Sequence, residues 1–171
     1  MAINHEPDIH NLVMCANIFI RKNNKYLVLR RSPLKRWAAG VAHPVGGKID
    51  LNEDPLTAAK REVLEETGLT VKNIKLEAVV FEIKPVKAEI GNWMIFHFSG
   101  DYDSGEIIET QEGELVWLTA DEFKQEKLFP SVGAIIDKIF DPSLGTVFAR
   151  FEYKTDHELD ESSKMIDTMN R

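Results

Sequence analysis

Residues 47–69 read GKIDLNEDPLTAAKREVLEETGL and contain one helix with clear start and stop signals. Asp54 followed by Pro55 is typical of a helix start, because an aspartate caps the first N–H groups and proline suits the first helical position. Gly68 is typical of a helix end. We therefore predict a helix over residues 55–67. Its apolar positions fall on one stripe: Leu56, Ala59 and Val63.

Three glutamates, Glu62, Glu65 and Glu66, share a neighbouring face of this helix at i, i+3 and i+4 spacing. Their mutual repulsion destabilises a helix unless something offsets it. Arg61 is spaced to pair with Glu65, and a glycine pair lies just before the helix. Clustered carboxylates beside a backbone carbonyl suit Mg²⁺, which prefers oxygen ligands. The alternative is a charged helix face that simply contacts water.

The spacing resembles the signature of the Nudix hydrolases. That signature is Gly, five residues, Glu, seven residues, Arg-Glu, an aliphatic residue, any residue, Glu-Glu, any residue, Gly and an aliphatic residue. Every fixed position is filled, by Gly47, Glu53, Arg61, Glu62, Val63, Glu65, Glu66, Gly68 and Leu69. A match at this many positions is far more specific than a lone glycine motif.

The resemblance implies an α/β fold, namely a Nudix-type α/β/α sandwich around a mixed β-sheet. It also implies metal-assisted attack of water on a nucleoside diphosphate linked to another moiety, with Mg²⁺ as the cation and Mn²⁺ as a substitute. Carried over by position, Glu62 and Glu66 are metal ligands and Gly47 offers its carbonyl. Glu65 is a further ligand or the base, and Arg61 orients it. Glu53 supports the set.

The general base of this family also occurs outside the signature, on a loop before a late strand. The corresponding loop here is SGEIIETQEGELVW, which contains Glu109, Glu112 and Glu114. We favour Glu112 as the base. The alternative for each of the three is a solvated loop carboxylate.

Basic residues gather around the signature in a chain that is otherwise acidic: Arg30, Arg31, Lys35, Arg36 and Lys48. Arginine binds phosphate oxygens through a two-pronged fork, so we name Arg31, Arg36 and Lys48 as substrate-binding candidates. A solvated loop is the alternative. The spacing also resembles part of the pattern of coenzyme A pyrophosphatases, but departs from it at Pro44-Val45, where an aromatic residue followed by proline is expected.

Aromatic side chains are candidates for stacking on a nucleobase: Trp37, Phe81, Trp93 and Trp117. We choose Trp93, although a core position is the usual role of a tryptophan on a strand. His43 and His97 are interpreted as structural, because no second histidine or cysteine stands at zinc-ligand spacing. Cys15, on an expected strand, is interpreted as a buried small apolar residue.

The remaining pattern predicts a single domain over residues 1–154. A hairpin is expected from 12–20 and 26–29, a loop from 30–47, and strands at 74–83, 93–98, 114–118 and 146–153. Helices are expected at 119–126 and 131–140. Residues 155–171 are expected to form an acidic polar tail, either solvated or partly ordered.

Composition excludes several classes of protein. The chain has 171 residues, one cysteine and a net charge of −7. Such acidity argues against duplex nucleic acid as a partner, because that binding requires surplus Lys and Arg. No apolar run is long enough for a membrane span, and neither a signal peptide nor paired cysteines point to export, so we expect a cytoplasmic protein. The charge is concentrated in residues 53–66 and 152–171, each with a net of −3.

The expected partner is a small nucleotide-type diphosphate. The alternatives are oxidised deoxynucleoside triphosphates, as for MutT, ADP-ribose or nucleotide sugars, and coenzyme A. A Nudix-fold binding module without turnover is a different class, but such modules typically lose signature glutamates. Isopentenyl diphosphate isomerase shares the fold, but its paired catalytic Cys and Glu are not found. Because members of the family often form dimers, a homodimer is a further expectation.

Overall fold

The structure of the protein is a computed structural model that describes residues 12–35, 38–83, 91–108, 110–155 and 158–169. In chain order the elements are β1 (Leu12–Lys22), β2 (Lys25–Arg31), β3 (Ala42–His43), β4 (Val45–Lys48), α1 (Pro55–Thr67), β5 (Leu69–Ile83), β6 (Asn92–Gly105), β7 (Gly113–Leu118), α2 (Ala120–Gln125), α3 (Pro130–Ile139), β8 (Val147–Thr155), β9 (Glu158–Leu159), the 3₁₀ turn η1 (Glu161–Ser163) and β10 (Met165–Thr168).

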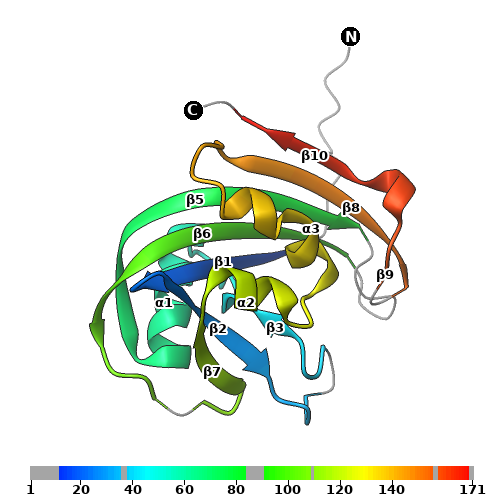
Figure 1. The fold of residues 1–171 in the computed structure, drawn as a ribbon. Coiled ribbons are helices and arrows are strands. Elements are labelled where there is room, and N and C mark those ends of the chain that lie inside the picture. Colours follow the sequence, from blue (N-terminus) through cyan, green and yellow to red (C-terminus); the bar gives the residue numbers. More distant parts are fainter. Residues whose placement is uncertain (1–11, 36–37, 84–90, 109, 156–157, 170–171) are drawn as a thin grey trace.

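One mixed sheet organises the chain (Figure 1), in the strand order β10-β8-β5-β6-β1-β2-β3. In addition, β4 pairs with β1, β7 with β2 and β9 with β8. The pairs β1–β6 and β5–β8 are parallel, and the other pairs are antiparallel. The expected N-terminal hairpin is confirmed as β1 and β2. Asn23 and Asn24 form its turn, both at positive φ, which asparagine tolerates better than most residues.

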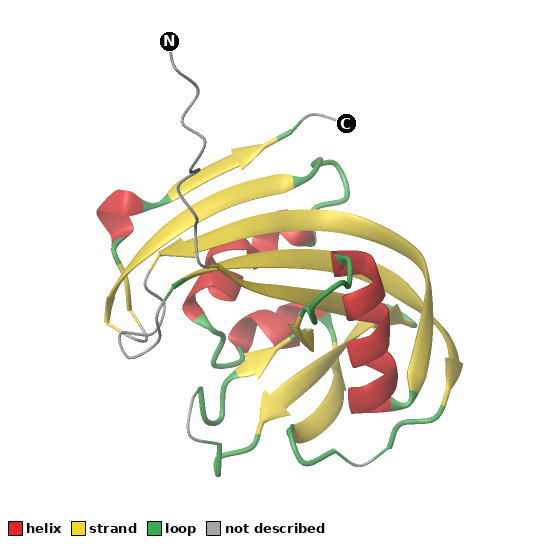
Figure 2. Cartoon of the chain, turned by 180° about the vertical axis from the view of Figure 1, so that it is seen from behind, coloured by secondary structure: helices red, strands yellow, loops and turns green. Residues whose placement is uncertain are grey.

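Helices cover both faces of the sheet, which confirms the predicted α/β/α sandwich. Figure 1 shows α2 and α3 in front of the sheet, and Figure 2 shows α1 on the opposite face. Each face has its own apolar cluster. Val63 of α1 packs with Ile18, whereas Phe123 of α2 and Ile135 of α3 pack with Phe19. None of the helices in the described part of the chain combines the length and apolar character needed to cross a membrane.

The helix α1 begins and ends where the sequence predicts. The Asp54 carboxylate accepts hydrogen bonds from the backbone N–H groups of Leu56, at 2.9 Å, and Thr57, at 3.1 Å. Gly68 ends the helix in the left-handed conformation, at φ 72°. Local chemistry therefore defines both ends of the helix that carries the signature glutamates.

Three of the expected elements, one loop and two strands, need correction. The expected loop 30–47 contains β3 and β4, because β4 pairs with residues 15–18 of β1. The strands expected at 74–83 and 93–98 are longer, because β5 and β6 pair with each other from Leu69 and Gly105 onwards. The long pairing contains register shifts, which interrupt the side-chain alternation from which strands are recognised.

The expected acidic tail is also more ordered than its composition suggests. β10 pairs antiparallel with β8, while β9 folds back on β8. Leu159 is buried and Ile166 packs against the cluster beneath α3. The acids are offset locally: Asp160 accepts a hydrogen bond from the backbone N–H of Ser162, and Glu161 pairs with Lys164 at 2.6 Å. Two apolar anchors thus dock a segment that is otherwise polar.

Candidate functional site

The glycine pair before α1 brings the backbone of β4 against the glutamates of the helix. The Gly46 N–H donates a hydrogen bond to Glu66 Oε2 at 3.3 Å. A Cβ atom added at Gly47 would lie 2.5 Å from Glu62 Oε1, so the carboxylate of Glu62 fills the space that a side chain would need. Because β4 is paired with β1, the sheet fixes this backbone, and α1 packs against the sheet through Ala58, Ala59 and Val63, whereas Leu56 of the expected stripe is exposed.

Arg61 holds three carboxylates and one carbonyl together. Its guanidinium donates to Glu53 through Nε and Nη2, at 3.0 and 2.9 Å, and to Glu62 Oε1 at 2.8 Å. It also donates to Glu65 Oε2 at 3.0 Å and to the Lys48 carbonyl at 3.0 Å. These bonds raise the pKa of Arg61, so it stays charged. The expected Arg61–Glu65 pair is present, together with contacts that helix spacing does not predict.

The glutamates differ in their electrostatics. Hydrogen bonds from Arg61 lower the pKa of Glu53. Burial raises the pKa of Glu62. Burial, followed by the nearby charge of Glu62, raises the pKa of Glu66 to about 7. The unfavourable charges are therefore on Glu62 and Glu66, which are the two carboxylates packed against the glycine pair.

The residues present are chemically suited to a divalent metal ion. All the donors are carboxylate or carbonyl oxygens, which hard cations prefer. Within the described ranges, however, no group of three acidic, histidine or cysteine side chains is gathered closely enough to hold an ion. Glu62 and Glu65 point to Arg61, and Glu66 points to the Gly46 N–H. Metal ligation therefore requires these side chains to turn from their present partners.

The basic loop reaches the same site from β2. Lys35 pairs with Glu112 at 2.7 Å, and Arg31 pairs with Glu112 at 3.4 Å. Both Glu112 and Arg31 lie close enough to act on the pKa of Glu66, which Glu112 raises and Arg31 lowers. Glu114 pairs instead with Arg30.

Two of the sequence-based candidates, Arg36 and Glu109, lie outside the described residues, as does Trp37. Of the other aromatic candidates, Trp117 lies near the β1–β2 turn, 6.0 Å from the ammonium of Lys22, and Phe81 is paired across the sheet with Met94.

A cavity of about 310 Å³ opens beside the glycine pair, on the face of the sheet that α3 covers. Arg31, Lys48 and Trp93, three of the predicted substrate-binding residues, are brought together in its lining. His97 of β6 and Ser131 of α3 also line it. Neither residue has a functional role predicted from the sequence, because nothing in their local pattern shows that they would meet in one cavity.

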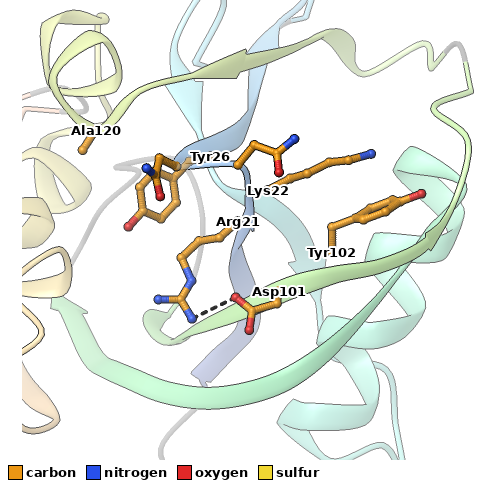
Figure 3. A pocket seen from close by; sticks show the side chains of 8 residues that line it. Arg21, Lys22, Tyr26, Asp101, Tyr102 and Ala120 are labelled. Carbon is orange, nitrogen blue, oxygen red and sulfur yellow. Dashed lines mark ion pairs between the residues drawn. The ribbon is translucent and has the colours of Figure 1, made fainter.

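A second cavity, of about 730 Å³, lies at the β1–β2 turn and is drawn in Figure 3. Its charged groups already have partners: Arg21 pairs with Asp101 at 3.0 Å, and the Lys22 ammonium lies 3.6 Å from the centre of the Tyr102 ring. None of the signature residues lines it. The candidate site is therefore the first cavity with the adjoining glutamates.

Comparison with known proteins agrees with this geometry. The NUDIX domain family matches residues 12–139. The chain is 29% identical to an uncharacterized Nudix hydrolase, YvcI, of Bacillus subtilis, over 84% of this chain and 88% of the relative. It is 32% identical to the 8-oxo-dGTP diphosphatase of Escherichia coli, over 66% of this chain and 87% of the relative.

Two further similarities are informative. The chain is 28% identical to the NAD-capped RNA hydrolase NudC of Haemophilus influenzae over 84% of its own length, but it spans only 52% of that relative. Among solved structures, the MutT protein of Bacillus halodurans superimposes with a TM-score of 0.76 at 26% identity, covering 91% of this chain and 97% of the other.

Proposed function

The chain belongs to the Nudix family of pyrophosphate-bond hydrolases, and from that premise we propose that it hydrolyses a nucleoside diphosphate linked to a second moiety, with Mg²⁺ as its cation. The observation that carries the proposal is the packing of Glu62 and Glu66 against the Gly46–Gly47 backbone, next to Arg31. Both carboxylates have a raised pKa there, so a bound cation would relieve unfavourable charge.

Glu62, Glu65, Glu66 and the Gly47 carbonyl would hold the metal, for which Mn²⁺ is a substitute. When bound, the metal neutralises diphosphate charge and lowers the pKa of a coordinated water. Arg31 and Lys48 bind phosphate oxygens from the lining of the cavity. Arg36 is also proposed to bind phosphate oxygens, on the basis of its place in the sequence alone. Arg61 positions Glu62 and Glu65, and Glu53 holds Arg61 in place.

The proposed reaction is a hydrolysis at phosphorus. The oxygen of water forms a bond to one phosphorus, the bridging P–O bond breaks, and the bridging oxygen leaves with the other phosphate. The products are a nucleoside monophosphate and the phosphorylated second moiety. Glu112 accepts the proton of the attacking water and releases it to solvent. Its position near Glu66, between Arg31 and Lys35, supports this assignment.

The test is product release from a panel of substrates, with and without Mg²⁺. The panel holds oxidised and ordinary deoxynucleoside triphosphates, ADP-ribose, nucleotide sugars and coenzyme A. We expect Glu62→Gln and Glu66→Gln to reduce kcat by orders of magnitude and to remove the Mg²⁺-dependent rise in melting temperature of the native protein. A folded wild-type protein that binds one substrate tightly without turning it over would instead be a binding module.

The role of Glu112 has a matched control in Glu114, which lies on the same segment and also pairs with an arginine. We expect Glu112→Gln to lower kcat by roughly 10²–10⁴-fold, the usual contribution of a general base. Glu114→Gln should keep the wild-type rate. Near-wild-type turnover in a folded Glu112→Gln variant would exclude Glu112 as the base and leave Glu65 as the candidate.

Assembly and location complete the proposal. We place the protein in the reducing cytoplasm, because its one cysteine, Cys15, is buried in the sheet. A homodimer is proposed from the family alone. Light scattering on the purified chain measures the assembly, and a monomer at all accessible concentrations would overturn that part.

A further inference from the structure

The cavity beside the glycine pair has a polar mouth and an aromatic interior. Lys48 is exposed, with its ammonium 6.0 Å from the centre of the Trp93 ring, and Arg31 is partly exposed and pairs with Glu112. Further lining comes from Trp93, Phe129 and Val132. Its volume of about 310 Å³ is at the lower end of the range for small-molecule sites.

His97 is the unusual group in this lining. Its side chain is completely buried, and neither Nδ1 nor Nε2 has a hydrogen-bond partner within the part of the chain that the structure describes. Burying a polar group without a partner is unfavourable, and such groups are rare in folded proteins. A ring contact with Phe19, at 5.9 Å between centroids, satisfies neither nitrogen. A bound ligand that hydrogen-bonds to these nitrogens would remove the free-energy cost of burying them.

The chemistry of the partner follows from the state of the imidazole. Burial lowers the pKa of His97 to about 3, so the ring is neutral at physiological pH and offers one donor and one acceptor. Desolvation also lowers the pKa of His43, a partly buried residue of the same lining, and its Nδ1 lies 2.7 Å from the Pro44 carbonyl. Its Nδ1 therefore carries the proton and its Nε2 is an acceptor. Neutral donors and acceptors between aromatic walls suit a flat, uncharged heterocycle rather than a further phosphate.

We propose that this cavity holds the nucleobase of the substrate, and that His97 is the residue that recognises its hydrogen-bonding edge. The inference rests on the proposed function, because the base must be joined to the diphosphate that the glutamates and Arg31 handle. Ser131, buried at the start of α3, contributes a hydroxyl group to the same lining. The preference for one nucleobase then depends on whether its hydrogen-bonding edge matches the one donor and one acceptor of His97.

The test is binding of nucleoside monophosphates, which are products of the proposed reaction, to the wild-type protein by calorimetry. The monophosphates of adenosine, guanosine, cytidine and uridine are compared with ribose 5-phosphate, which lacks only the base. We expect at least one monophosphate to bind ten-fold or more tightly than ribose 5-phosphate, with quenching of tryptophan fluorescence that is lost in Trp93→Phe. Equal binding of all five compounds would overturn the proposal.

Single substitutions test which residue of the cavity recognises the nucleobase. His97→Phe keeps a ring of similar size in the apolar site and removes both nitrogens, so we expect a ten-fold or greater loss of the preferred monophosphate and unchanged binding of ribose 5-phosphate. Ser131→Ala should give a smaller loss. Tyr102→Phe is the matched control, because it removes one hydroxyl from the other cavity, and it should bind as the wild type does.

A measurement on the wild-type protein covers the case in which His97→Phe does not fold. In protein labelled with ¹⁵N-histidine, the preferred monophosphate should shift the ring nitrogens of His97, whereas ribose 5-phosphate should not. Unchanged resonances at saturation would overturn the proposal. Hydrolysis without any preference for a base would remove this inference alone, whereas base-selective binding without hydrolysis of any substrate would remove the proposed function alone.

Discussion

At the scale of single residues, glycine is required at position 47 because the carboxylate of Glu62 lies against its backbone. A Cβ atom at this position would lie 2.5 Å from Glu62 Oε1, closer than two such atoms approach. We expect Gly47→Ala to fold, since the flexible end of Glu62 can move, but to lose at least about ten-fold in kcat because a misplaced metal ligand weakens the site. Initial rates with saturating Mg²⁺ measure this.

Gly133 offers the matched control for that substitution. It lies within α3, and the nearest atom to an added Cβ is 3.8 Å away, an ordinary contact. Because alanine is the better helix former, Gly133→Ala should keep the wild-type rate and raise stability by about 0.5–1 kcal/mol. A wild-type rate in Gly47→Ala would show that the position of Glu62 does not limit turnover.

The same scale shows how far individual residues could be predicted. The Arg61–Glu65 pair follows from i, i+4 spacing on one helix. The bonds from Arg61 to Glu53 and to the Lys48 carbonyl depend on how the preceding loop returns to α1, which spacing does not determine. His97 is a stronger case, because its sequence neighbours do not reveal whether its ring nitrogens find hydrogen-bond partners among the described residues once β6 is buried.

At the scale of elements, β10 provides a test of whether the C-terminal segment docks. Ile166 packs against the core cluster, whereas its neighbour Met165 is 55% exposed on the other side of the strand. We expect Ile166→Asp to lower the free energy of unfolding by about 1–3 kcal/mol, because it places an unpaired charge against an apolar cluster. Met165→Asp should change it by less than about 0.5 kcal/mol. Urea titrations of both variants give the comparison, and equal effects would mean that the segment does not dock.

Sequence predicts some elements better than others. An element is predicted well when residues within it or beside it specify it, and poorly when it forms only by pairing with a distant strand. The ends of α1 are specified within a few residues, by Asp54 and Gly68, and were predicted correctly. β4 is four residues long and contains the glycine pair, so its strand character comes only from pairing with β1. β10 is similar, because four residues in an acidic context become a strand by pairing with β8.

At the scale of the whole molecule, the two acidic stretches have different physical accounts. The glutamates of α1 are partly offset by Arg61 and have raised pKa values at Glu62 and Glu66, which is where a cation is proposed. The acids near the C-terminus are instead offset pairwise, as in the contacts of Asp160 with Lys154 and Glu161 with Lys164. Of the two stretches that contribute most to the net charge of −7, the one in α1 therefore lies where a cation is proposed. The acids of the other are paired within the docked C-terminal segment.

Glu82 gives the molecule a pH dependence that is separate from the site. It is completely buried between β6 and β8, its Oε1 accepts a hydrogen bond from the Tyr153 hydroxyl at 3.0 Å, and its Oε2 has no hydrogen-bond partner among the described residues. Burial raises its pKa to about 7, from an ordinary value of 4.5. The folded state thus holds a proton that the unfolded state releases. Stability is full below pH 4.5, falls as the pH rises to about 7, and stays reduced above that.

Glu82→Gln keeps the shape and the hydrogen bond to Tyr153 but removes the titration. A shift from 4.5 to about 7 corresponds to about 3 kcal/mol, so the variant should exceed the wild type in unfolding free energy by about that amount at pH 8 and by far less at pH 5. Urea unfolding at the two pH values measures the difference. Because Glu66 titrates in the same range, only the difference between variant and wild type isolates Glu82. Curves that stay parallel from pH 5 to pH 8 would show that Glu82 does not bind this proton on folding.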